Sequence, residues 1–191
     1  MARTNDIGQY VNELTGGVDN LKLMKLCYFA QGWHLAWSGR PLFTDELQAW
    51  KHGPVSRALW DKLVATKSLH GSTLAQPLGN SSNLSDYERE VVAAVVEFYA
   101  GQNSWTLRNW SHDAAWLAAR GDLPEDASCS NAMSVTDIRN VFSDKARTDS
   151  AVPSAPLRPD SLDALSWGLD PEAEAELEAD WAETFLRLAD R

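Results

Sequence analysis

The chain has 191 residues and a formal net charge of −10, from 17 Lys and Arg against 27 Asp and Glu. This length allows one well-buried domain with an appendage, and the acidic balance disfavours a surface that follows nucleic-acid phosphates. The two isolated cysteines, Cys27 and Cys129, give no disulfide framework and suggest a reducing compartment. The first residues lack the apolar run of a signal peptide, so we expect a cytoplasmic protein without a membrane segment.

A short amphipathic helix is predicted first, over Asp6–Leu14. The stretch 20–38 follows, and on a helical wheel it is apolar over most of its circumference. A helix of this kind lies in the middle of a fold, with neighbours on several sides. Lysines and other polar residues interrupt it too often for a membrane span. We therefore expect a compact, mainly α domain built around a central buried helix at 20–38.

Lys25 is the unusual residue of this helix, because it projects from the middle of the apolar arc. A buried ammonium group without a partner would cost several kcal/mol. Lys25 must therefore reach a surface with its charged end, meet a carboxylate or carbonyl oxygens, or take part in chemistry. The sequence leaves these possibilities open.

The segment after the central helix is expected to be extended. Pro41 cannot continue the helix, and residues 42–52 allow one small β-ribbon. Gly53-Pro54 is predicted as a turn whose proline opens a helix over 54–66. That helix would place three apolar side chains on one face: Val55, Leu59 and Leu63.

Three further helices are predicted over 85–100, 104–121 and 134–142. The serine that begins each of them is its expected cap. The first also has a glutamate three positions after that serine, which makes a capping box. Residues 68–83, rich in Gly, Ser and Asn, are predicted to be a loop.

The C-terminal part has a different composition. Prolines make residues 148–169 a stiff, extended connector, and residues 170–191 are predicted to form an acidic amphipathic helix. Residues 151–191 hold ten Asp and Glu against three Arg, a net of −7, so most of the excess acidity lies in this tail. We therefore divide the chain into a domain at 1–147, the connector and the C-terminal helix. The apolar stripe of that helix consists of Leu177, Trp181, Phe185 and Leu188.

The sequence gives no sign of catalysis. The four histidines and two cysteines show no spacing typical of metal ligands, and neither a phosphate-binding loop nor a nucleophile elbow is present. Cys27 and His34 lie two helical turns apart, too far for proton transfer. His112-Asp113 is a pair that commonly caps or hydrogen-bonds at a helical surface. We predict no catalytic residue, no cofactor and no metal, with an enzyme that uses Lys25 or His112 as the alternative.

Aromatic, glycine and proline positions follow a specific order in two stretches, KLMKLCYFAQGWHLAWSGRPLF at 22–43 and AWKHGPV at 49–55. Together they resemble the Panacea domain, also called the SocA-like or GepA-like domain. The stretch HDAAW at 112–116 resembles a second, weaker signature of that family. The resemblance extends over about residues 5–145 and does not reach the tail. Its signature positions in this chain are Lys25, Tyr28, Phe29, Gln31, Gly32, Trp33, Trp50, Gly53, Pro54 and Val55.

The resemblance implies a neutralising or adaptor module, since the family occurs in phage-associated proteins and in antitoxins of bacterial toxin–antitoxin pairs. We expect an antitoxin that binds a cognate toxin protein directly. A toxin directed at RNA or translation is expected, as for some relatives. The alternative is a proteolysis adaptor, as in the SocA branch, which delivers its toxin to a cytosolic AAA+ protease. A nucleic-acid partner is not expected.

Two roles remain open for the predicted C-terminal helix. It folds back on the same domain, or its apolar stripe enters a groove of the toxin. In the second case its acidic face would meet basic residues that the toxin uses for RNA. Such complementary charge would speed association and assist discrimination.

Overall fold

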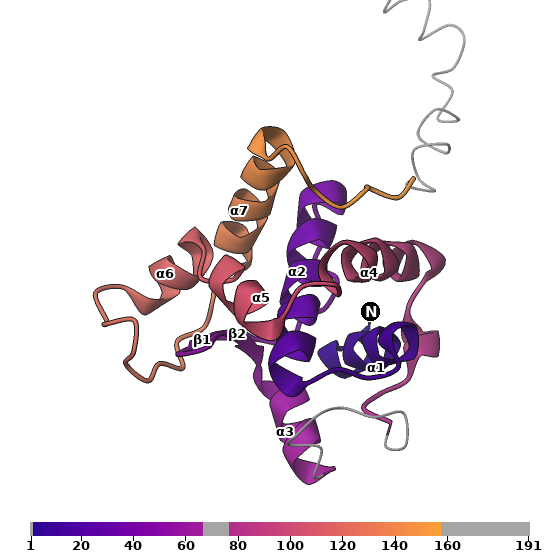
Figure 1. Ribbon diagram of the computed structural model, residues 1–191, viewed down its shortest axis with the longest axis horizontal. Coiled ribbons are helices and arrows are strands. Elements are labelled where there is room, and N and C mark those ends of the chain that lie inside the picture. Colours follow the sequence, from indigo (N-terminus) through magenta and orange to yellow (C-terminus); the bar gives the residue numbers. More distant parts are fainter. Residues whose placement is uncertain (1, 67–76, 158–191) are drawn as a thin grey trace, which may run out of the picture. The chain divides into compact units, whose positions relative to one another are not determined.

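The helix predicted at the centre of the fold is the axis of the structure (Figure 1). This helix, α2, spans Asn20–Ser38, the predicted bounds. The Asp19 carboxylate caps its first turn by accepting a hydrogen bond from the Lys22 amide at 3.0 Å. Every residue from Leu23 to Leu35 is buried, because helices and the ribbon pack on several sides of α2. The expectation of a central buried helix is therefore confirmed.

This computed structural model describes residues 2–66 and 77–157. The chain divides into two compact units, Met1–Pro156 and Leu157–Arg191. Only the first residue of the second unit belongs to the described residues. The helix expected over 170–191 therefore lies outside them and stays a prediction. The same holds for its apolar stripe of Leu177, Trp181, Phe185 and Leu188.

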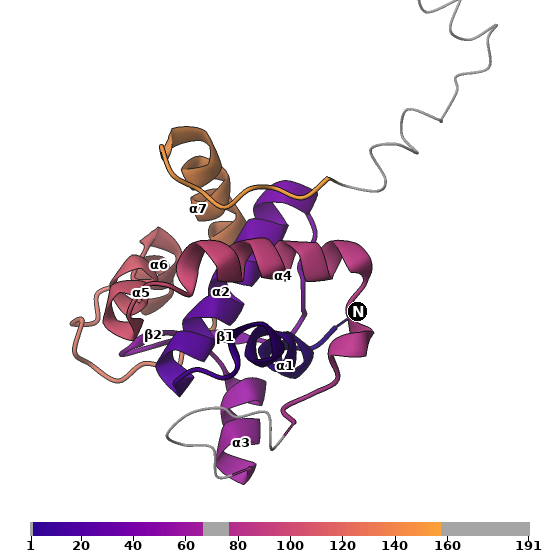
Figure 2. The same cartoon turned by 45° about the vertical axis from the view of Figure 1, so that its right-hand side comes forward.

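The other described helices are arranged around α2, with α1 on one side and α6 and α7 on the other (Figures 1 and 2). This arrangement confirms the mainly α fold class. No helix among the described residues is long and apolar enough to cross a membrane. The helices are α1 (Thr4–Thr15), α3 (Arg57–Ala65), α4 (Asp86–Tyr99), α5 (Ser104–Trp110), α6 (Ala114–Arg120) and α7 (Val135–Thr148), with a 3-10 turn, η1, at Ser81–Asn83.

Gly32 allows α7 to approach α2 closely. The Phe142 ring of α7 lies edge-on to Tyr28 and Trp33, with ring centroids 5.6 and 5.4 Å apart. A Cβ atom at Gly32 would lie only 2.3 Å from the Phe142 ring. Since a packed interior leaves no slack of that size, the contact between the two helices requires glycine at this position.

The expected ribbon is present, but it includes residues that we predicted to be helical. Strands β1 (Leu47–Trp50) and β2 (Gly53–Ser56) pair antiparallel, with Trp50 opposite Gly53. The chain turns through residues 51–52, and Gly53 has a φ of 91°, a conformation that favours glycine. The ribbon therefore begins and ends later than the predicted 42–52.

The prediction that Pro54 opens a helix is wrong. Pro54 lies in β2 opposite Ala49, and the Ala49 amide donates to the Asn131 carbonyl outside the ribbon at 2.9 Å. Because this pair needs no amide proton from Pro54, proline is tolerated in the strand. Helix α3 begins at Arg57, after Ser56 caps it. Val55 consequently belongs to the strand and not to the apolar face of α3.

The helix predicted over 104–121 is broken into α5 and α6. Asn103, not Ser104, caps α5 by accepting from the Thr106 amide at 2.8 Å. Asp113 caps α6 by accepting from the amides of its first turn. Because an Asp that caps one helix cannot lie inside another, the two short helices are separate elements. The capping box predicted at 85–88 and the cap predicted at Ser134 are confirmed.

The Gly32 contact gives a test of the core. Alanine is the better helix former by about 1 kcal/mol, but overpacking a core costs about 1–3 kcal/mol. Because the new methyl group would overlap the Phe142 ring, we expect Gly32→Ala to lower the free energy of unfolding by about 2 kcal/mol, measured by urea denaturation. Gly101→Ala is the control, since nothing lies within 4 Å of its Cβ position. Equal stability of the two variants would contradict the proposed packing.

Candidate functional site

Lys25 joins the central helix to the ribbon. Its side chain has no exposed surface, and its Nζ donates a hydrogen bond to the Pro54 carbonyl at 2.9 Å. A Cβ atom at Gly53 would lie 2.8 Å from Nζ and 2.6 Å from the Ser111 hydroxyl oxygen. Three signature residues, Lys25, Gly53 and Pro54, therefore meet in one contact. Of the roles left open by the sequence, the structure gives Lys25 a partner in a backbone carbonyl.

Burial changes the proton affinity of Lys25. Removal from water lowers the pKa of its amine well below the ordinary value, and the positive charge of Arg108 lowers it further. No carboxylate contributes to this shift. The amine therefore binds its proton more weakly in the folded protein than in the unfolded chain.

Tyr28 links α2 to the start of α6. Its hydroxyl donates to the two carboxylate oxygens of Asp113, at 2.8 and 3.0 Å. Burial and the neighbouring Asp113 raise the pKa of Tyr28 well above its usual value. Burial also raises the pKa of Asp113, although Lys145 opposes that change. Asp113 thus serves both as a helix cap and as a partner for a signature tyrosine.

Gln31 fixes the segment that leaves the central helix. Its amide oxygen accepts hydrogen bonds from the backbone amides of Leu42 and Phe43, at 2.8 and 3.2 Å. Its amide nitrogen donates to the Phe43 carbonyl at 3.0 Å. Because Gln31 is buried, these bonds replace the water that the backbone groups would otherwise bind. This signature residue therefore has a structural role.

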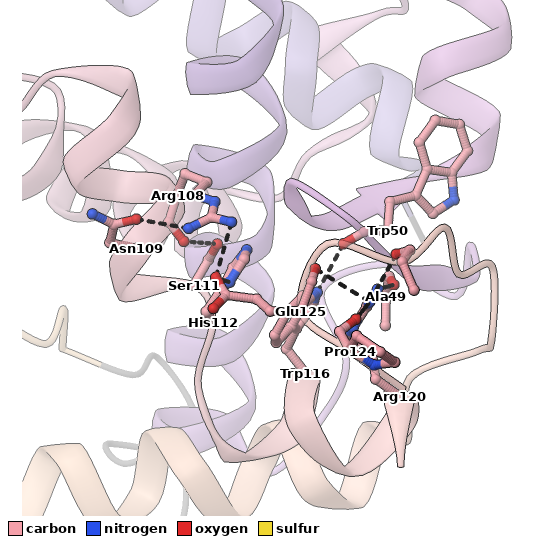
Figure 3. Close-up of polar contacts among 11 residues, drawn as sticks. Ala49, Trp50, Arg108, Asn109, Ser111, His112, Trp116, Arg120, Pro124 and Glu125 are labelled. Atoms are coloured by element: carbon pink, nitrogen blue, oxygen red, sulfur yellow. Dashed lines mark hydrogen bonds and ion pairs between the residues drawn. The ribbon is translucent and has the colours of Figure 1, made fainter. Parts of the chain in front are cut away.

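A polar network holds α5 and α6 to the loop that follows them (Figure 3). Glu125 accepts from Arg108 at 3.0 Å and lies 3.2 Å from His112 Nδ1. His112 also stacks on Trp116, with ring centroids 3.7 Å apart. Burial, together with the charge of Arg108, lowers the pKa of His112 to about 4. His112 is therefore neutral at pH 7. Its polar partner is Glu125, whereas Asp113, the next residue in the sequence, contacts Tyr28.

Arg120 is a structural residue that the sequence did not single out. Its guanidinium group is almost fully buried and lies 4.6 Å from the Trp116 ring. It donates to the carbonyls of Ala49, Pro124, Glu125 and Ala127 (Figure 3). The Trp116 indole donates in turn to the Trp50 carbonyl at 3.0 Å. The last two residues of β1 are thereby attached to α6.

An apolar groove of about 300 Å³ lies where α2, the ribbon and α3 meet. We call it the Trp50–Trp60 groove, because these two half-buried rings lie in an edge-to-face arrangement with centroids 5.5 Å apart. Three signature residues, Lys25, Trp50 and Val55, are among those that line it. It is lined by Asn20, Leu21, Met24, Lys25, Trp50, Lys51, His52, Val55 and Trp60.

An exposed tryptophan lies beside this groove. Trp105 of α5 is 61% exposed, and its ring meets that of His52 with centroids 5.9 Å apart. Exposed aromatic side chains next to an apolar concavity are typical of protein-binding surfaces. The Trp50–Trp60 groove with Trp105 at its edge is therefore the candidate functional site.

The side chains considered as metal ligands or as nucleophiles lie in surroundings that do not favour these roles. Among the described residues, no group of three or more His, Cys, Asp or Glu side chains is arranged to hold a metal ion. Cys27 is fully buried, and burial raises the pKa of its thiol to about 12. A thiol of that pKa carries almost no thiolate at pH 7, which is the nucleophilic form.

The lowered pKa of Lys25 predicts a pH effect on stability. The unfolded chain binds the proton with a pKa near 10.5 and the folded chain with a lower one, so the unfolded chain carries more protons between the two values. Wild-type stability should therefore rise with pH in this window relative to Lys25→Met, by up to about 1.4 kcal/mol per pH unit. Urea denaturation of both proteins at pH 7, 8, 9 and 10 measures this difference.

The comparison isolates Lys25, because Cys27 and Tyr28 titrate in both proteins and cancel. Lys22→Met is the control: Lys22 is partly buried on the same helix, and its Nζ also donates to a carbonyl, that of Ala100. A stability difference between wild type and Lys25→Met that stays constant from pH 7 to pH 10 would contradict the assignment.

The residues of this region match a known family. Residues 23–117 match the family described as antitoxin SocA-like, Panacea domain. The matched segment runs from α2 into α6 and contains all the signature positions. Comparisons with curated proteins and with solved structures give no match. Through this segment the chain belongs to the SocA-like antitoxin family, and the matched residues include most of the central helix, the whole ribbon and most residues that line the Trp50–Trp60 groove.

Proposed function

We propose that this protein is an antitoxin that neutralises a cognate toxin by direct protein–protein binding at the Trp50–Trp60 groove. The observation that carries the proposal is the position of signature residues Trp50 and Val55 on the wall of an open apolar groove. Residues needed only for packing would lie inside the core, as Trp33 and Phe29 do. Trp50 is instead half-buried and lines a groove that a partner can reach, while Val55, which also lines it, is largely buried.

The composition of the groove supports a protein partner. Tryptophan is among the residues that contribute most to binding energy at protein interfaces. Trp50 and Trp60 form one wall, and Trp105 adds an exposed ring beside His52. Because the Lys25–Pro54 contact fixes the ribbon against α2, the groove is formed before a partner arrives. A preformed site loses less conformational entropy on binding.

Binding rather than catalysis is part of this proposal. The three side chains that could serve as catalytic groups have hydrogen-bond partners or protonation states typical of structural residues. Lys25 Nζ is bonded to a carbonyl, Cys27 is a buried thiol, and His112 has a pKa of about 4. Cys27 and His112 therefore have pKa values far from the range near 7 that suits a general base or nucleophile at neutral pH, while the Lys25 amine is held by its carbonyl partner.

We further propose that the toxin acts on RNA or on translation. Such a toxin needs a basic surface for RNA phosphates, and this chain carries a net charge of −10. Most of that charge is in residues 151–191, where the sequence predicts an acidic helix with an apolar stripe. Its stripe residues, Leu177, Trp181, Phe185 and Leu188, would bind a second area of the toxin and place carboxylates against its basic surface.

The groove is tested by Trp60→Ala. Replacing a tryptophan at the centre of an interface by alanine typically costs about 2 kcal/mol or more of binding free energy, which is about 30-fold in Kd. We expect toxin affinity to fall by at least this factor, measured by calorimetry, with neutralisation lost in cells that express the toxin. Val64→Ala is the control, since Val64 is exposed on the same helix and does not line the groove.

Two results would contradict the groove proposal: unchanged affinity in Trp60→Ala, or equal losses in both variants. Neutralisation should also be measured in a host without AAA+ proteases. Rescue that persists there supports sequestration of the toxin. Rescue that disappears there while toxin binding is retained supports the alternative function, a proteolysis adaptor.

The tail is tested with a chain that ends at Leu157, which keeps the buried Pro153. We expect weaker toxin binding, mainly through slower association, because the deleted residues carry most of the negative charge. The loss should shrink at high salt, since screening removes long-range attraction. Association rates at 50 and 500 mM salt measure this. Identical rates for the full and shortened chains would exclude the proposed role of the tail.

A further inference from the structure

The mouth of the Trp50–Trp60 groove has a charge opposite to that of the chain. Lys51 and His52, both exposed, form the turn of the ribbon at the edge of the groove. The chain has 27 Asp and Glu residues, yet neither α2 nor the segment 47–56 contains one. The elements that build the groove are therefore without acidic side chains, apart from α3.

The carboxylates closest to the groove along the chain already have partners. Asp61, the one acidic residue of α3, pairs with Arg57 at 2.9 Å. Asp19, which precedes α2, accepts from the Lys22 amide at 3.0 Å and from the Ser104 hydroxyl at 2.5 Å. Neither is bonded to Lys51 or His52. The positive charge at the groove mouth is therefore not neutralised by these two groups.

The surroundings of His52 agree with this description. Partial burial is the largest cause that lowers its pKa, and the charges of Arg108, Lys51 and Lys25 lower it further. No carboxylate opposes them. The lowered pKa leaves less positive charge on His52 itself, so a negative group at the groove mouth would meet mainly the charge of Lys51, with no carboxylate among the causes that act on His52. Arg108 is already paired with Glu125.

We propose that the Trp50–Trp60 groove binds a toxin segment in which one large apolar side chain is flanked by Asp or Glu. The apolar side chain enters the groove and packs against the wall formed by Trp50 and Trp60, and a flanking carboxylate contacts Lys51. A groove of about 300 Å³ is large enough for one such anchor. The pairing at the rim selects the segment by charge and speeds its association. This inference rests on the proposed function and adds the chemistry of the partner segment.

Synthetic peptides test the inference without the toxin. Fluorescently labelled nine-residue peptides carry a central Phe with Glu on both sides, the same Phe with Lys on both sides, or Ala with Glu on both sides. Fluorescence anisotropy with the full chain measures their Kd values. We expect the Glu–Phe peptide to bind at least about 10-fold more tightly than each of the other two, since loss of the anchor or of the rim attraction costs about 1.4 kcal/mol or more.

Variants of the rim locate the binding. Lys51→Glu should remove the preference for the Glu–Phe peptide or reverse it toward the Lys–Phe peptide. Lys62→Glu is the control, because it makes the same charge change on α3 at a residue that does not line the groove. Trp60→Ala should weaken the binding of every peptide that carries Phe.

The inference fails if the Lys–Phe peptide binds as tightly as the Glu–Phe peptide, if no peptide binds, or if Lys51→Glu and Lys62→Glu have equal effects. In those cases the proposed function is judged separately. Loss of toxin binding in Trp60→Ala would still support the groove as the toxin site. Retention of toxin binding in Trp60→Ala would remove both the proposed function and this inference.

Discussion

The hydrogen bond from Lys25 to the Pro54 carbonyl is the interaction on which the rest of the domain depends. It places a long polar side chain inside the most buried helix and directs it at the backbone of β2. The contact is possible only because Gly53 has no side chain and a positive φ. With β2 held against α2, Trp50 at the end of β1 and Val55 in β2 face the same apolar groove. The buried Lys25 amine, which is costly to remove from water, thus determines the geometry of the Trp50–Trp60 groove.

Other residues of α2 hold the remaining elements in place. Tyr28 binds the cap of α6, Gln31 binds the segment after the helix, and Gly32 admits the Phe142 ring of α7. Each contact depends on a residue that an ordinary apolar helix would not require. Tyr28 and Gln31 contribute polar groups, and Gly32 leaves room because it has no side chain. These contacts fix the elements against α2, and a preformed surface favours tight binding because less freedom is lost when the partner arrives. This is the physical link between the signature of the family and its proposed use.

Much of the fold could be predicted from local sequence. The bounds of α2 follow from Asp19 and Gly39, and the capping box opens α4 as expected, because caps act within a few residues. The start of α3 could not be predicted, since Pro54 is favourable both in a first helical turn and in this strand. Only the Lys25 contact and the pairing with Ala49 decide between them. Long-range contacts therefore decide that Pro54 lies in a strand, where the local sequence alone predicted a helix.

The candidate site was less predictable than the fold. The sequence identified Lys25 as unusual but not its partner, which lies 29 positions away. Arg120 gave no periodic signal, although its guanidinium group joins β1, α6 and the following loop. The groove also depends on three elements whose spacing along the chain is irregular, so no pattern could reveal it. Three of the signature residues, Lys25, Trp50 and Val55, nevertheless line the groove.

A structure of the protein in complex with the toxin that it neutralises would test the central claim most directly. The account predicts that a side chain of the toxin fills the groove and packs against Trp50 and Trp60, with the start of α2, the ribbon turn and α3 in the interface. The Lys25–Pro54 contact should be unchanged from the free protein, since the groove is already formed. A complex in which this groove remains open to solvent, or in which Lys25 has left Pro54 to contact a ligand, would contradict it.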